Sequence, residues 1–340
     1  MLGRYGIVAL TVLASAGCSQ PAAPINVTGS STVYPFTKIV ADRFVATTKG
    51  AAAPVIQSVG TVTGIKTFCA GPGAPDILNA SRRINRKEFA GCQTNKAGEI
   101  MEIPIGLDGI ALAEANGGPK LSLTSKDLYL ALAANPRGQP NTAKTWRDVN
   151  PTLPAIPIKV LGPPTSSGTR ESFVTLILEP GCIEAMPEAA AMRSGSDPAT
   201  FDRACRQIRD DGPYVTASED YSATAQALER DPTALGLFGY SYLEQRADRL
   251  RGVPINGVVP TATTIAHGDY KGIRQLFLYV KKGHLTAKPS VQAFLDLYAK
   301  MWTPGGPLAK AGLIPMTDRT ASRSLAVIKN GYPIEAAELP

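Results

Sequence analysis

Three short segments rich in glycine, serine and threonine are the parts of this sequence best suited to chemistry. They cover residues 29–32, 60–64 and 166–169, and each follows a short apolar run and precedes a helical pattern. The first turn of a helix leaves backbone N–H groups unpaired and carries a partial positive charge, so it attracts oxyanions. Serine and threonine hydroxyls add donors, and glycine lets a ligand approach the backbone. One such turn alone is more often an ordinary helix cap, but three together predict an oxyanion-binding cleft.

Alternating strands and helices must position these turns and a fourth polar turn, Ser81-Arg82. The apolar patterns predict strands at residues 25–29, 54–59, 76–78, 103–113, 158–161, 235–240 and 276–280. Helical patterns lie between them at residues 36–44, 64–68, 124–133, 171–178 and 290–302. This alternation is typical of an α/β protein.

Composition limits the classes of function. The chain has 340 residues, of which 44% are hydrophobic and 19% charged, so it can form two ordinary domains with packed cores. The formal net charge is +7, but the basic residues are spread along the chain rather than clustered. Binders of nucleic acid usually concentrate their positive charge, so we expect no nucleic acid partner. A modest positive field suits a small anionic ligand.

The N-terminus predicts export. A short positive start ending at Arg4 precedes an apolar run over residues 5–16, which is too short to span a bilayer. The run ends in Ser-Ala-Gly before Cys18, which resembles the lipobox of bacterial lipoproteins, with Ser15 where that pattern prefers leucine. We therefore expect a signal peptide at 1–17, lipidation of Cys18 and a tether at 18–24. Cleavage by an ordinary signal peptidase near Ala16 is the alternative.

The other cysteines predict two disulfides. Cys69 and Cys92 are 23 residues apart, and so are Cys182 and Cys205, which favours local pairing among three possible connectivities. The two histidines, His267 and His284, lie in turn-like segments and form no metal-ligand pattern. The sequence also has no nucleophile elbow or Walker motif. We expect no metal, no cofactor and no enzymatic activity.

Several motifs in order resemble one family. The segment TGSSTVYP at residues 28–35 is similar to the opening motif of the periplasmic phosphate-binding proteins that serve ABC phosphate importers. The resemblance extends over residues 25–315 and includes GIKTF at 64–68, ASR at 80–82, LDGI at 107–110, TSKDL at 124–128, WRDVNP at 146–151, SGTRE at 167–171 and ASED at 217–220.

The resemblance implies an α/β fold of the two-lobed type II periplasmic binding class. Each lobe would be a central mixed sheet flanked by helices, and two crossover strands would join the lobes. We expect lobe I at 25–106 plus 257–325, lobe II at 107–256 and a C-terminal tail at 326–340. The hinges are expected near 105–110 and 252–260, so that the lobes close around the ligand.

The same resemblance assigns residues to a phosphate site. Carried over by position, these are Ser31, Thr32, Val33, Thr61, Ser81, Arg82, Ser167, Gly168 and Thr169. Arg82 stands where many members have an aspartate that accepts the phosphate proton, and Pro163 stands where an arginine is usual. We expect Arg82 to supply the charge pairing, with Arg170 as a second candidate. The replacement acceptor stays open among Asp108, Glu219 and Asp220.

The function implied is a lipid-anchored, extracytoplasmic and monomeric receptor. It would capture inorganic phosphate and deliver it to the permease of an ABC importer. Another tetrahedral anion, such as sulfate, arsenate or phosphite, is the nearest competing ligand because the usual aspartate is missing. A secreted phosphatase and a phosphate-sensing or adhesion lipoprotein are two further possible functions.

Overall fold

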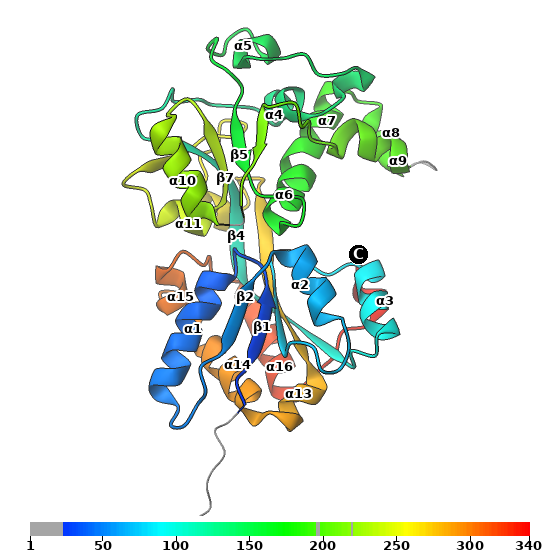
Figure 1. Cartoon of the computed structure of the whole chain (residues 1–340), viewed down its shortest axis with the longest axis vertical. Coiled ribbons are helices and arrows are strands. Elements are labelled where there is room, and N and C mark those ends of the chain that lie inside the picture. Colours follow the sequence, from blue (N-terminus) through cyan, green and yellow to red (C-terminus); the bar gives the residue numbers. More distant parts are fainter. Residues whose placement is uncertain (1–22, 195–197, 219) are drawn as a thin grey trace, which may run out of the picture.

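The computed structural model describes residues 23–194, 198–218 and 220–340. The expected signal peptide and Cys18 lie outside these residues. Two lobes lie one above the other along the longest axis of the molecule, and two strands run between them (Figure 1). Among the described residues, no helix has the length and apolar character needed to cross a membrane.

Lobe I contains a mixed sheet in the order β2-β1-β3-β9-β4. The first three strands are parallel, whereas β9 is antiparallel to both β3 and β4. The strands are β1 (Asn26–Gly29), β2 (Val55–Ser58), β3 (Ile77–Ala80), β4 (Ile100–Ala115) and β9 (Ile273–Lys281). The helices are α1 (Tyr34–Thr47), α2 (Thr61–Phe68), α3 (Arg86–Thr94), α13 (Lys282–Ala287), α14 (Pro289–Met301), α15 (Pro307–Lys310) and α16 (Asp318–Asn330).

Lobe II continues the sheet in the order β4-β7-β5-β6, and β8 pairs with the end of β4. Its other strands are β5 (Val160–Gly162), β6 (Tyr214–Thr216), β7 (Leu235–Gly239) and β8 (Leu250–Gly252). Its helices are α4 (Ser125–Leu132), α5 (Trp146–Val149), α6 (Gly168–Phe173), α7 (Glu179–Ala185), α8 (Ala189–Ser194), α9 (Pro198–Phe201), α10 (Tyr221–Arg230), α11 (Tyr240–Glu244) and α12 (Ala262–Ala266). A π-helical segment, η2 (Val174–Leu178), joins α6 to α7, and a second, η3 (Asp202–Arg206), follows α9.

The crossover strands are β4 and β9. The long strand β4 pairs with β9 along lobe I and with β7 in lobe II, and its register against β9 shifts between Pro104 and Gly106. The expected hinge at 105–110 therefore lies within a real crossover. The expected second hinge at 252–260 is wrong, because Gly252 pairs with Ala113 inside lobe II and the chain crosses back only at β9. The glycine and proline residues at 252–260 form turns within lobe II. The chain returns to lobe I along strand β9, which is paired with β4.

This correction also moves the lobe boundaries. Ile265 and Tyr270 are packed in the core of lobe II, so residues 257–272 belong to that lobe and not to lobe I. The segment 326–340 is not a tail, because helix α16 continues to Asn330 and its Val327 and Ile328 are buried in the core of lobe I. Farther on, Leu339 is buried against α2 and α3. Apolar residues at the end of the chain thus complete lobe I.

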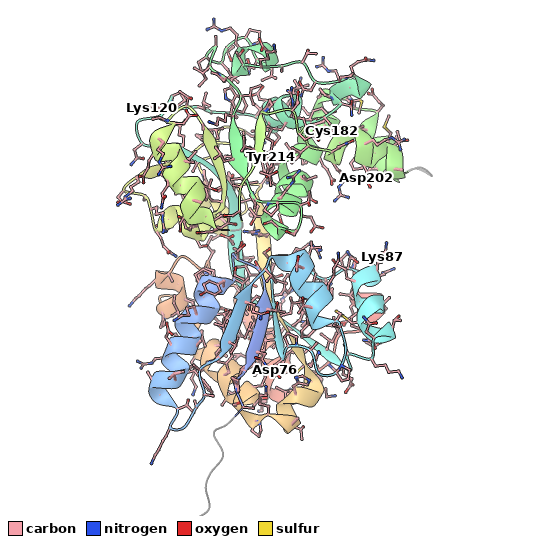
Figure 2. All side chains as sticks on the ribbon, viewed as in Figure 1. Asp76, Lys87, Lys120, Cys182, Asp202 and Tyr214 are labelled. Carbon is pink, nitrogen blue, oxygen red and sulfur yellow. A yellow bond between two sulfur atoms is a disulfide. The ribbon has the colours of Figure 1, made fainter. Side chains whose placement is uncertain are left out.

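Both predicted disulfide pairings are confirmed. Cys69–Cys92 joins the end of α2 to α3 in lobe I, and Cys182–Cys205 joins α7 to η3 in lobe II. Cys182 lies among the helices at one side of lobe II (Figure 2). The sulfur atoms of all four residues are therefore used in holding peripheral helices to their own lobe.

Candidate functional site

A buried ion pair lies at the junction of the two lobes. Asp108 on β4 and Arg274 on β9 are partners in the antiparallel register, and both are almost fully buried. The Asp108 Oδ2 atom accepts bonds from Arg274 Nε at 3.1 Å and Nη2 at 2.8 Å. The backbone N–H of Ser241 donates to the other carboxylate oxygen at 3.1 Å. This network uses three of the roughly four lone-pair positions of the carboxylate and leaves other N–H groups of the arginine for neighbouring oxygens.

One threonine hydroxyl from each lobe accepts a bond from this arginine, and a tyrosine hydroxyl contacts both threonines. Arg274 donates to Thr32 Oγ1 at 2.8 Å and to Thr169 Oγ1 at 3.0 Å. The Tyr221 hydroxyl lies 2.6 Å from Thr169 Oγ1 and 3.3 Å from Thr32 Oγ1. We call Thr32, Thr169 and Tyr221 the hydroxyl cluster. Its members come from the loop before α1, from α6 and from α10, so it forms only where the lobes meet.

Three more predicted residues meet beside the hydroxyl cluster. The side-chain oxygens of Thr61 and Ser81 lie 2.9 Å apart, and Ser81 N–H donates to Thr61 at 3.2 Å. Gly168 of lobe II packs against both, since a Cβ atom there would lie 2.2 Å from Ser81 Oγ. Only glycine allows this approach of the two lobes.

Arg82 bridges the lobes by a different set of contacts. Its guanidinium donates to Glu88 of its own lobe at 2.7 and 2.9 Å and, through Nε, to Glu171 of lobe II. Burial alone would lower the pKa of Arg82, but the bonds and charges of the two glutamates raise it above its usual value. We expected Arg82 to face the anion. The structure pairs it with protein carboxylates and places Arg274 at the hydroxyl cluster instead.

The remaining predicted residues have local roles in this structure. Val33 is buried in the core of lobe I, and the N–H groups of Thr32 and Val33 both point to Ser30 Oγ. Ser167 caps α6 by accepting the Thr169 N–H at 3.2 Å. The backbone donors expected for a ligand are therefore bonded to neighbouring serines here. Ser31 lines a cavity next to the hydroxyl cluster.

The comparisons with known proteins give the family. A model of the PBP superfamily domain matches residues 14–300. The chain belongs to the PBP superfamily. Protein SphX from Synechocystis sp. PCC 6803 is 31% identical over 92% of this chain and 85% of its own length. The phosphate-binding protein PstS from Staphylococcus saprophyticus is 25% identical over 87% of this chain and 82% of its own length.

Solved structures share the fold of this PBP superfamily chain. The crystal structure of an ABC-type phosphate transport receptor from Vibrio cholerae aligns with a TM-score of 0.57 and 19% identity. The alignment covers 86% of this chain and all of the other. At this identity the likeness supports the two-lobed α/β fold, which confirms the fold class predicted from the motifs.

The other charged candidates of this PBP superfamily member lie outside the hydroxyl cluster. Arg170 stacks over the ring of Tyr214, with its guanidinium carbon 4.6 Å from the centroid, and Tyr214 lies inside lobe II (Figure 2). Asp220 is exposed and caps α10 by accepting the Ser222 N–H at 2.8 Å. Glu219 lies outside the described residues. Of the three acceptor candidates, Asp108 is the one that the described structure places at the junction.

Sequence reasoning did not select Arg274 and Tyr221, which the structure places with Thr32 and Thr169 at the junction of the lobes. Arg274 had a readable signal, because it is a charged residue in a strand whose following positions, 276–280, are all apolar or aromatic. A buried charge needs a partner, and such pairs are common at functional sites. Tyr221 had no comparable signal, since a tyrosine early in an amphipathic helix is usually part of the core. Among the described residues, no cluster of histidine, cysteine, aspartate and glutamate is suited to a metal ion.

Proposed function

We propose that this protein captures inorganic phosphate between its lobes and delivers it to the permease of an ABC importer. The observation that carries the proposal is the meeting of Thr32, Thr169 and Arg274 across the two lobes. These groups are donors, and they lie in a buried position where hydrogen bonds to a charged oxygen are strong. The similarity to the Staphylococcus phosphate-binding protein supports the same ligand.

In the proposed mechanism, phosphate replaces the contacts that the lobes make with each other. The hydroxyls of Thr32, Thr169 and Tyr221 now satisfy one another at 2.6 to 3.3 Å. When the lobes part about the β4–β9 crossover, each hydroxyl can turn to an oxygen of the anion. Thr61, Ser81 and Gly168 would then supply further contacts. Nothing in this mechanism breaks a bond of the ligand, so the proposed role is that of a receptor and not of an enzyme.

Asp108 is the proposed source of selectivity. A carboxylate accepts the proton of monohydrogen phosphate but repels the fully ionised oxygens of sulfate. Asp108 is held beside the hydroxyl cluster by Arg274, which balances its charge. We propose that it takes the role that the aspartate missing at Arg82 has in many members of the resembling family.

Calorimetric titration tests the proposal. A soluble protein beginning at Ser19 would be unfolded, dialysed and refolded to remove bound ligand, and then titrated with phosphate in the presence and absence of excess sulfate. We expect tight 1:1 binding of phosphate that sulfate leaves unchanged. Absence of heat with either anion would contradict the function, and competition by sulfate would contradict the role of Asp108.

The location of the receptor is a separate proposal. We propose that Cys18 carries the lipid that holds the receptor outside the cytoplasm, because the Ser-Ala-Gly before it resembles a lipobox. Two acyl chains on this one cysteine would be enough for a stable anchor. The full-length wild type should incorporate radiolabelled palmitate, and Cys18→Ala should not. Equal labelling of the two proteins, or no labelling of the wild type, would contradict lipidation of Cys18.

A further inference from the structure

A cavity of about 430 Å³ lies between the lobes next to the hydroxyl cluster. This volume falls within the range of about 300–1,000 Å³ that is typical of sites for small organic ligands. An orthophosphate ion would fill only a small part of it. The cavity is therefore much larger than the proposed function requires.

The cavity and the hydroxyl cluster share a wall. Thr32 and Tyr221 line the cavity, and their hydroxyls also contact Thr169 on the other side. A phosphoryl group held at the hydroxyl cluster would thus have one oxygen directed at the cavity. A substituent on that oxygen would enter the cavity without crossing either lobe.

The lining of the cavity suits a neutral, hydroxylated group. Ser222, Ser241 and Gln245 provide polar atoms, while the rings of Tyr221 and Tyr242 meet edge to face with their centroids 5.2 Å apart. The charged residues in the lining are one acid, Asp220, and one base, Arg246, and the base is stacked over the Tyr242 ring at 3.9 Å. This balance gives no attraction for a second anion.

Tyr242 contributes its ring to the cavity wall. Its hydroxyl oxygen is buried and closed off from solvent, so the cavity meets the ring and not the hydroxyl. The ring therefore offers an apolar face against which the carbon chain of a small polyol can pack.

We propose that the cleft also accepts phosphomonoesters of small polyols, with the phosphoryl group at the hydroxyl cluster and the polyol in the cavity. This inference rests on the proposed function, because it uses the same anion site. It adds a class of ligand in which the neutral end is recognised as well as the charged end.

Calorimetry with inorganic phosphate, glycerol 3-phosphate and glycerol tests the inference on the refolded protein. We expect glycerol 3-phosphate to bind 1:1 within about tenfold of the phosphate affinity and to compete with phosphate, and glycerol alone not to bind. Phosphate binding without ester binding would overturn the inference and leave the proposed function standing. Absence of binding by both anions would overturn both.

One variant locates the ester. Ser222→Trp on α10 should fill the cavity and weaken ester binding at least about tenfold while phosphate affinity stays within about twofold. The matched control is Ala223→Trp, an exposed neighbour on the same helix that does not line the cavity and should change neither affinity. Equal losses of both ligands in Ser222→Trp would overturn the inference.

Discussion

Asp108 and Arg274 face each other on the two strands that join the lobes, with Arg274 Nη2 2.8 Å from Asp108 Oδ2. One member of this pair lies on each crossover strand, so the pair is fixed by the register of β4 against β9 rather than by flexible loops. The same guanidinium reaches Thr32 in lobe I and Thr169 in lobe II. The pair is thus a rigid support against which both lobes place a hydroxyl.

Replacing Arg274 by methionine should destabilise the protein strongly. The substitution leaves the buried carboxylate of Asp108 without its counter-charge, which costs about 3–5 kcal/mol in other proteins. The free energy of unfolding from urea denaturation would measure the loss. Arg249→Met is the control, because the Arg249 side chain is 64% exposed and its ion pair with Glu229 contributes little.

The double variant Asp108→Asn, Arg274→Met separates the charge effect from packing. Removing both charges should recover part of the stability lost in Arg274→Met, because no uncompensated charge remains. If the two substitutions were simply additive, the pair would not be coupled as described.

Thr169→Val should weaken phosphate binding by about 1–3 kcal/mol, because it removes a hydroxyl of nearly the same shape and leaves an anion oxygen unpaired. Titration calorimetry measures the change. Thr175→Val is the control, since its exposed hydroxyl donates only to the backbone carbonyl of Glu171 in the same helical segment. Equal affinity of Thr169→Val and the wild type would remove Thr169 from the site.

Glu171→Gln should make the ligand-free protein more open. The carboxylate of Glu171 pairs across the lobes with Arg82, which keeps its second partner, Glu88, within lobe I. Loss of the interlobe charge shifts the population toward separated lobes. Small-angle X-ray scattering should show a larger radius of gyration for Glu171→Gln than for the wild type. The control is Glu184→Gln, at an exposed site of the same helical segment, which should leave the radius of gyration unchanged. An unchanged radius would mean that the pair does not hold the lobes together.

Lys281 should give the stability a distinctive dependence on pH. Burial lowers the pKa of this lysine to about 8, although the charge of the nearby Asp76 opposes the shift. Asp76 lies near the base of lobe I (Figure 2). Between about pH 8 and its unfolded value of 10.5, the unfolded chain binds a proton that the folded chain has released. The contribution of Lys281 to stability therefore rises with pH across this window.

Comparison with Lys281→Met isolates this contribution. The free energy of unfolding of the wild type minus that of the variant should increase between pH 7.5 and 10, by at most about 3 kcal/mol. A difference that stays constant over this range would contradict a lowered pKa.

The sequence predicted the fold well where local patterns and ordered motifs agreed. The turn after β1 and the α6 start at Ser167 lie where the motifs placed them, and both cysteine pairs are those that the equal spacing predicted. The second crossover could not be located in this way. Glycine and proline around residues 252–260 signal turns, but which turn leaves a lobe depends on long-range strand pairing that no local pattern contains.

The hydroxyl cluster was predicted in part for a similar reason. Thr32 and Thr169 carry two of its three hydroxyls, and both were selected from their turns. The partner of Arg82 could not be selected, because Glu171 lies 89 residues away in the chain and meets it only when the lobes pack. Arg274 depends on the strand register, which brings residue 108 opposite residue 274. Residue types in a turn can suggest a binding site. Which charged residues pair with each other depends on tertiary contacts that the local sequence does not contain.

The position of β9 in the middle of the lobe I sheet has a consequence for the order of folding. Strands β3 and β4 have no direct pairing, and β9, from the last quarter of the chain, fills the place between them. During synthesis, which starts at the N-terminus, the edges of β3 and β4 that later pair with β9 therefore stay unpaired until residue 281 has been made. Lobe II takes the intervening residues in one continuous stretch and can fold first. Lobe I, although it begins the chain, is therefore the last to be completed.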